Sequence, residues 1–165
     1  MAHTIEQPET ANKREFYQEL ALQLSGLVTG ERDWIANAAN TAALLYQALP
    51  GVNWVGFYFL KGGELVLGPF QGKPACVRIA LGRGVCGAAA EARRPIVVPD
   101  VYLFPGHIAC DTASRSELVV PLIAGDQLWG VLDLDSPSPA RFDEEDRAGC
   151  ERLAAIYVAA SDLRA

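Results

Sequence analysis

The sequence predicts an α+β fold, a single domain in which a six-stranded antiparallel sheet carries helices packed on it. Three observations lead to this class. Apolar residues recur every three or four positions near both ends of the chain, which is typical of amphipathic helices. Between these regions, short apolar runs alternate with glycine-rich turns, which favours strands joined by hairpins. The length of 165 residues suits one hydrophobic core.

Two helices are expected ahead of the sheet. Apolar side chains spaced from Phe16 to Leu27 predict a helix over 12–27. Asp33 is a residue type that caps helix starts, and the apolar positions after it predict a second helix that stops before Pro50-Gly51. The polar residues 1–11 include a proline and are expected to be disordered, so that the folded domain spans 12–163.

The middle of the chain reads as strands. Residues 53–60 are apolar on both alternating sides, with Trp54 and Tyr58 on one side and Val55 and Phe57 on the other, which is typical of a central strand covered on both faces. Hairpin turns are expected at Gly62-Gly63 and Gly125-Asp126. The remaining elements are strands over 64–67, 75–79, 95–98, 118–123 and 128–135, a short helix over 86–91, a loop over 100–114, and a closing helix with the acidic run 143–146 in its first turn.

Composition narrows the function classes. The chain has 14 basic and 20 acidic side chains, a net charge of -6, and no basic cluster, so nucleic acid is not an expected partner. No apolar run approaches the roughly 20 residues of a membrane-spanning helix, and the first residues lack the basic-then-apolar order of a signal peptide. We therefore expect a cytoplasmic protein with no membrane association.

Three of the four cysteines, Cys76, Cys86 and Cys110, fall within one segment. In a reducing compartment such cysteines are free, redox-active or buried more often than they form structural disulfides. Cys110 is the least core-like, because it lies in a polar loop near His107, where a cationic imidazole would lower the pKa of a thiol. Cys76 and Cys86 are the candidates to resolve a Cys110 sulfenic acid by forming a disulfide.

The cysteines allow two other interpretations. Cys150 lies on an ordinary helix and is expected to be a core residue. A zinc site from His107 and the three clustered cysteines has suitable ligand types, but its spacing is irregular and lacks a CxxC motif, so no metal is expected.

A second group of candidates is acidic. Asp133 and Asp135 lie two positions apart on a strand and share a face, although they could also be the solvated end of an edge strand. A plain two-residue turn at Gly125-Asp126 would set Glu117 opposite Leu134, on the other face. One extra residue or a bulge sets Glu117 opposite Asp135 instead, and we predict this arrangement.

Two further features could belong to a binding site. Trp54 and Tyr58 share a face and could wall a pocket, although they could equally be ordinary core aromatics. The glycine-rich turn at 81–87 offers backbone N–H groups at a helix start, which suits an anion such as a carboxylate.

Four segments together resemble the free methionine-R-sulfoxide reductase family, which is built on a GAF domain. They are GPFQGKPAC at 68–76, GRGVCG at 82–87, GHIACD at 106–111 and GVLDLDS at 130–136. The resemblance covers about 12–160. It implies that free L-methionine (R)-sulfoxide is reduced to methionine without a cofactor, through a cysteine sulfenic acid and an intramolecular disulfide that thioredoxin recycles.

The resemblance also implies residue roles. Cys110 falls at the position of the family's nucleophile, Cys76 at that of its main resolving thiol and Cys86 at that of a further, less settled thiol. Its substrate-binding residues match Trp54, Tyr58, Glu117, Asp133 and Asp135. Because Cys110 must reach substrate in one step and Cys76 in the next, we expect the 100–114 loop to differ between reduced and oxidised protein.

Two expectations remain from the residues themselves. The first and last amphipathic helices could pair with a second copy, so a homodimer is expected. The alternative from another function class is a non-catalytic GAF sensor that holds a small ligand without chemistry.

Overall fold

The computed structural model of the chain describes residues 12–108 and 110–164. The expectation of disorder over 1–11 lies outside these residues. The elements in chain order are α1 (Lys13–Val28), α2 (Trp34–Ala48), β1 (Trp54–Lys61), β2 (Glu64–Gly72), β3 (Arg78–Ala80), α3 (Gly84–Ala92), β4 (Ile96–Val98), the 3₁₀ turn η1 (Val101–Leu103), β5 (Ser116–Ala124), β6 (Gln127–Ser136) and α4 (Glu144–Ala160).

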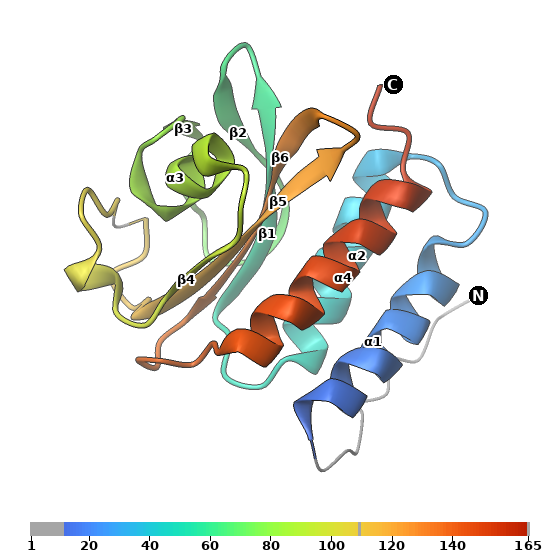
Figure 1. Cartoon of the computed structure of the whole chain (residues 1–165), viewed down its shortest axis with the longest axis horizontal. Coiled ribbons are helices and arrows are strands. Elements are labelled where there is room, and N and C mark those ends of the chain that lie inside the picture. The colour runs from blue at the N-terminus through green and yellow to red at the C-terminus, as the bar shows by residue number, and fades with distance from the viewer. Residues whose placement is uncertain (1–11, 109, 165) are drawn as a thin grey trace.

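The six strands form one antiparallel sheet in the order β3-β2-β1-β6-β5-β4. Helices α2 and α4 cover one face of this sheet, and α1 lies outside them, while α3 and the segment that follows β4 cover the other face (Figure 1). The predicted α+β class with a six-stranded antiparallel sheet is therefore confirmed. Among the described residues, no helix is both long and apolar enough to cross a membrane.

Helices α1, α2 and α4 begin where the sequence offers a capping side chain. Asn12 accepts a hydrogen bond from the backbone N–H of Glu15, and Asp33 accepts from Ile35 and Ala36. Asp143 and Asp146 form a capping box at the start of α4. These bonds satisfy N–H groups that have no partner inside a helix, which explains why the predicted starts match the observed ones.

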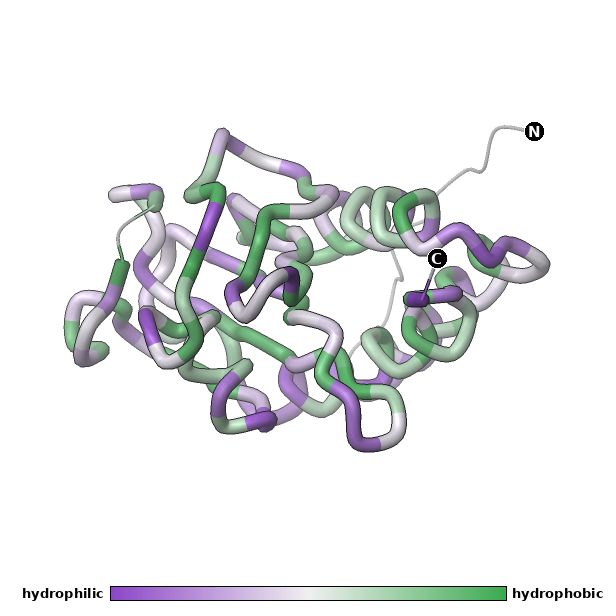
Figure 2. The backbone as a smooth tube through the Cα atoms, turned by 90° about the horizontal axis from the view of Figure 1, so that it is seen from above, coloured by the Kyte–Doolittle hydropathy of each residue, from purple (hydrophilic) through white to green (hydrophobic). Residues whose placement is uncertain are grey.

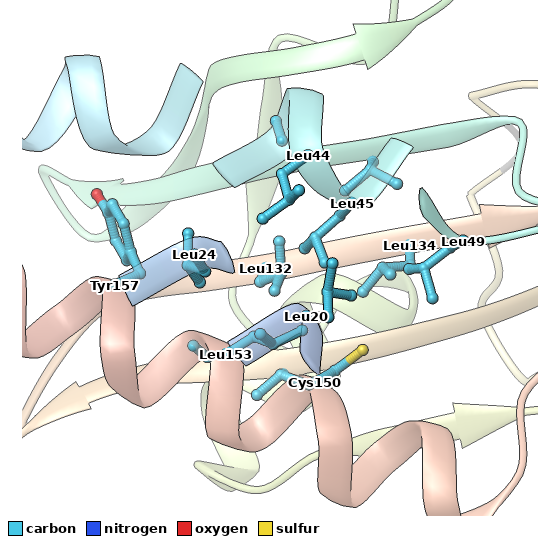
Figure 3. Close-up of a cluster of buried hydrophobic side chains, with 14 of the residues drawn as sticks. Leu20, Leu24, Leu44, Leu45, Leu49, Leu132, Leu134, Cys150, Leu153 and Tyr157 are labelled. Carbon is cyan, nitrogen blue, oxygen red and sulfur yellow. The ribbon is translucent and has the colours of Figure 1, made fainter. Parts of the chain in front are cut away.

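The larger core lies between the sheet and helices α1, α2 and α4 (Figure 3). Leu20 and Leu24 of α1 belong to this cluster together with Leu132 and Leu134 of β6, and Cys150 of α4 lies among them without solvent exposure. The expectation that Cys150 is a core residue is confirmed. Hydrophilic residues gather in the turns at the periphery of the molecule (Figure 2).

A smaller core lies on the opposite face of the sheet, under α3. Strand β1 contributes to both cores, with Val55, Phe57 and Phe59 in the larger one and Trp54 and Tyr58 in the smaller one. The central, doubly covered strand predicted over 53–60 is confirmed. Its alternation sends Trp54 and Tyr58 to the face that also holds α3.

The hairpin between β5 and β6 has the predicted register. The two-residue turn pairs Ala124 with Gln127 and Ile123 with Leu128, but a bulge at Trp129 shifts the register, so that Leu122 pairs with Gly130 and Glu117 lies opposite Asp135. Gly130 follows the bulge with φ of 155°, and a Cβ there would lie 2.0 Å from the carbonyl oxygen of Tyr58. Only glycine allows β1 to approach so closely, and the bulge turns Glu117 toward the α3 face.

The third predicted strand is wrong over most of its length. It was expected over 75–79, whereas β3 begins at Arg78. Pro74 has no N–H to donate, and the carbonyl oxygen of Cys76 accepts a hydrogen bond from the Tyr58 hydroxyl at 3.0 Å. These residues therefore form a loop held by side chains, and the chain enters the sheet only after Val77.

Candidate active site

A disulfide joins Cys76, in the loop ahead of β3, to Cys110, in the loop between η1 and β5, with Cα atoms 5.5 Å apart. The other two cysteines are free and buried. The two bonded residues are 34 positions apart in sequence, so the fold itself brings these loops together. With Cys76 and Cys110 bonded to each other, the zinc set considered with His107 is not available in this state.

The disulfide lies beside a cleft of about 570 Å³, a volume that includes its open mouth. The cleft is bounded by the α3 face of the sheet, the start of α3 and the loop that carries Cys110. Cys110 is among its lining residues, whereas Cys76 is not.

The predicted carboxyl residues meet at the floor of the cleft. Glu117 on β5 and Asp133 on β6 are 7% and 6% exposed, and Asp135 is partly buried beside them. The interpretation of the two aspartates as a solvated strand end is therefore wrong. Among the described residues, none of these three carboxyls forms an ion pair, and Asp133 Oδ1 is buried without any hydrogen-bond partner.

Burial without a cation changes how these carboxyls titrate. Desolvation raises the pKa of Glu117 well above its usual range, and the nearby Asp133 raises it further. Desolvation and then Asp133 likewise raise the pKa of Asp135. Desolvation raises the pKa of Asp133 to about 6, although hydrogen bonds from Cys86 and Glu117 lower it. Asp133, with a pKa of about 6, is thus the carboxyl that ionises near neutral pH, while the pKa of Glu117 lies well above its usual range.

Cys86 lies on α3 directly over this acidic floor. Its Sγ atom is 3.8 Å from Glu117 Oε1. Desolvation raises the pKa of the Cys86 thiol, and Asp133 and Glu117 raise it further. Cys86 is therefore a protonated thiol in this state, which makes it a poor nucleophile.

Trp54 and Tyr58 form an aromatic wall of the cleft. Their rings stack at 5.9 Å between centroids, and Trp54 also stacks on Phe70 at 5.3 Å. Both side chains donate hydrogen bonds to the loop that carries Cys76, Trp54 to the carbonyl oxygen of Lys73 and Tyr58 to that of Cys76. The aromatic wall therefore also fixes the position of Cys76.

The loop that carries Cys110 is tied down by polar contacts. Asp111 lies 3.8 Å from the ammonium of Lys73, in an ion pair between the two loops. The Tyr102 hydroxyl donates to the carbonyl oxygen of Thr112, and Tyr102 meets the His107 ring edge-on. Desolvation lowers the pKa of His107, so the cationic imidazole suggested by the sequence is not supported.

The start of α3 faces the cleft without a side-chain cap. Arg83, Gly84 and Val85 line it, and Arg83 makes no side-chain cap hydrogen bond. The first N–H groups of α3 therefore have no side-chain cap and are suited to an anion.

The fold brings together every residue that the sequence singled out for the site. Seven of the eight line the cleft, and Cys76 joins them through its bond to Cys110. Sequence reasoning missed Ser114 and Ile108, which also line the cleft. Ser114 is buried and within 3.4 Å of the Asn53 amide, a contact between distant segments that no local pattern signals.

Comparison with known proteins found a matching domain family and similar proteins that share one name. The GAF domain family model matches residues 33–160. The free methionine-R-sulfoxide reductase of Escherichia coli is 52% identical over 144 residues, which is 87% of this chain and 87% of the relative. The Saccharomyces cerevisiae protein of the same name is 42% identical over 153 residues, 88% of this chain and 85% of the relative.

A solved structure gives the same picture. The free methionine-R-sulfoxide reductase of Neisseria meningitidis, in complex with its substrate, is 46% identical with a TM-score of 0.91. The match covers 96% of this chain and 95% of that one.

Proposed function

This chain belongs to the free methionine-R-sulfoxide reductase family, built on the GAF domain, and we propose that it reduces free L-methionine (R)-sulfoxide with the thiols of Cys110 and Cys76. The observation that carries the proposal is a disulfide between these two residues at a cleft floored by carboxyls. A sensor that only holds a ligand has no need of a thiol pair at its binding site.

The reaction balances with the groups present. The Cys110 thiolate attacks the sulfoxide sulfur while an acid protonates the sulfoxide oxygen. The S–O bond of this adduct then breaks and its oxygen leaves as water. A water molecule attacks the Cys110 sulfur, methionine leaves with its sulfur reduced, and Cys110 is left as a sulfenic acid. The Cys76 thiol then attacks the Cys110 sulfur, water leaves, and the disulfide forms. An external dithiol, for which we propose thioredoxin, reduces the disulfide and completes the cycle.

The positions of the two cysteines support this division of roles. Cys110 lines the cleft where substrate would lie, whereas Cys76 does not and is held from behind by Tyr58. Glu117 is our candidate for the proton donor, because burial raises its pKa well above the usual range and so favours its protonated form. Cys86 remains a further thiol of the site, buried and protonated.

The polar groups of the cleft suit a free amino acid. Asp133 ionises near neutral pH and has an unpartnered oxygen, so it is the natural partner for a substrate ammonium. The first N–H groups of α3 suit the substrate carboxylate, and Trp54 and Tyr58 suit the apolar side chain. A peptide-bound methionine has no ammonium at this position, so it would leave Asp133 buried and unpaired.

The location and assembly of the protein are part of the proposal. Recycling by thioredoxin requires a reducing compartment, in line with the expected cytoplasm. For the assembly, we propose that two copies pair through the first and last helices, α1, whose Leu22 is 72% exposed, and α4. Sedimentation analysis of the purified protein tests the homodimer.

The test is a coupled assay in which thioredoxin, its reductase and NADPH are mixed with the protein and one sulfoxide at a time. We expect NADPH oxidation with free methionine R-sulfoxide, none with the S form or a peptide-bound sulfoxide, and none with Cys110→Ser. Cys150→Ser is the matched control and keeps its activity, because Cys150 lies in the other core. No oxidation with either free sulfoxide would refute the proposal in favour of the ligand sensor.

A further inference from the structure

The floor of the cleft brings together more ligand-type atoms than the proposed reaction uses. Cys86 Sγ, a Glu117 oxygen and an Asp133 oxygen all lie within 4.8 Å of one another. The three residues come from three elements, α3, β5 and β6, and all are buried. Their arrangement is therefore fixed by packing rather than by flexible surface side chains.

The two carboxyls of this group have no cationic partner among the residues that the structure describes. Asp133 is 6% exposed, and its Oδ1 atom has no hydrogen-bond partner. Neither Asp133 nor Glu117 forms an ion pair among the residues that the structure describes. Buried carboxylates are normally paired or coordinate a metal, because an isolated buried charge is costly.

The geometry fits a small divalent cation. Zinc binds thiolate sulfur at about 2.3 Å and carboxylate oxygen at about 2.1 Å, which places the sulfur and oxygen roughly 3.5 Å apart in a tetrahedron. The Cys86 Sγ to Glu117 Oε1 distance is 3.8 Å. Small side-chain rotations would close the triangle around an ion, and the fourth position would face the open cleft.

We propose that Cys86, Glu117 and Asp133 form a binding site for one soft divalent cation of the Zn²⁺ or Cd²⁺ class, which occupies the place of the substrate ammonium. A thiolate ligand selects such cations over Mg²⁺ or Ca²⁺, which prefer oxygen ligands alone. The cation is an inhibitor rather than a cofactor, because it binds the Asp133 carboxylate that would otherwise bind the substrate ammonium. The competition with substrate rests on the proposed function, whereas cation binding does not.

The test titrates Cd²⁺ into the protein with its Cys76–Cys110 disulfide closed, in buffer without thiols or chelators. In this state only Cys86 and Cys150 have free thiols. We expect the ultraviolet charge-transfer band of a cadmium–thiolate bond, saturating at one ion per chain. Cys86→Ser loses the band, and Cys150→Ser, the matched control in the other core, retains it.

Two further variants keep the thiol and remove one carboxylate each. We expect Glu117→Gln and Asp133→Asn to weaken Cd²⁺ binding by more than about tenfold, because changes even to outer-shell partners of metal ligands typically cost that much. These variants stay informative if Cys86→Ser fails to fold. The proposal is overturned if the oxidised protein shows no band, if the band survives in Cys86→Ser, or if both carboxamide variants bind as tightly as the native protein.

Competition is measured in the same titration. Free L-methionine should raise the apparent dissociation constant for Cd²⁺ more than D-methionine does. The two enantiomers chelate the ion equally in solution, so any difference between them reports binding in the cleft. Equal effects of both would refute the overlap of cation and substrate. If the cadmium–thiolate band is absent but the protein still reduces the sulfoxide, only this inference is refuted. If the band is present but the protein does not reduce the sulfoxide, only the proposed function is refuted.

Discussion

Replacing Asp133 by asparagine should damage activity and improve stability at the same time. In the native protein, burial raises the Asp133 pKa from 3.8 to about 6, which corresponds to about 3 kcal/mol lost from the free energy of unfolding once the carboxylate is ionised. Asparagine keeps the shape without the charge. The same change removes the proposed partner of the substrate ammonium, and losing one member of a buried charge pair costs roughly 2–5 kcal/mol.

The sign of the pH dependence follows from the raised pKa. The native protein keeps the full contribution of a neutral Asp133 below about pH 4 and loses it as the pH rises through about 6. Asp133→Asn should therefore match the native protein at low pH and exceed it by up to about 3 kcal/mol at about pH 8. In a domain of this size that difference raises the melting temperature by about 6–12 °C.

The assays are urea and thermal unfolding at both pH values and the coupled NADPH assay. The expected loss in kcat/KM is about thirtyfold to several thousandfold, from the same 2–5 kcal/mol. Asp126→Asn is the matched control, because Asp126 is an exposed residue of the β5–β6 turn and should change neither quantity. A variant that is no more stable than the native protein at high pH, or that keeps full kcat/KM, would refute the reasoning.

Three further predictions concern the thiols, the sheet and a helix cap. Cys76→Ser should release one methionine per chain and then stop, leaving a Cys110 sulfenic acid that a dimedone-type reagent labels; sustained thioredoxin-linked turnover would argue against Cys76 as the resolving thiol. Gly130→Ala should destabilise the protein by about 3 kcal/mol in urea unfolding, because the new Cβ would meet the Tyr58 carbonyl oxygen, and an unchanged midpoint would contradict the close approach of β1 and β6. Asp143→Ala should cost about 1 kcal/mol by removing the α4 cap. Burial raises the Asp143 pKa, but hydrogen bonds from Lys13 and the Asp146 backbone outweigh it and hold the pKa at about 2, so this loss should vanish in unfolding experiments as the pH falls toward about 2.

Local patterns were sufficient for most of the fold. The cap at Asp33, the acidic first turn of α4 and the two-sided alternation of β1 act between neighbours in sequence, and their predictions are confirmed. The strand predicted over 75–79 is wrong because its fate depends on a distant side chain. The Tyr58 hydroxyl donates a hydrogen bond to the carbonyl oxygen of Cys76, and no pattern within the segment predicts that contact.

The site residues were identified by the family motifs, but their chemical states were not. Sequence placed His107 near Cys110 and suggested an imidazolium, whereas burial lowers the His107 pKa. The carboxyls of Glu117, Asp133 and Asp135 were expected together, yet only their surroundings show that no cation accompanies them among the described residues. A pKa depends on solvent access and on charges from other elements, which the sequence does not contain.

By itself, the sequence determined the α+β class, the helix starts, the family and the residues on which the chemistry depends, because periodicity, capping and motif spacing are local properties of the chain. Only the tertiary structure decided which thiols meet, which carboxyl ionises first and that Cys86 lies over Glu117. These properties arise from distances between residues far apart in the chain and from the removal of water, and both are set when the loops and α3 close over the sheet.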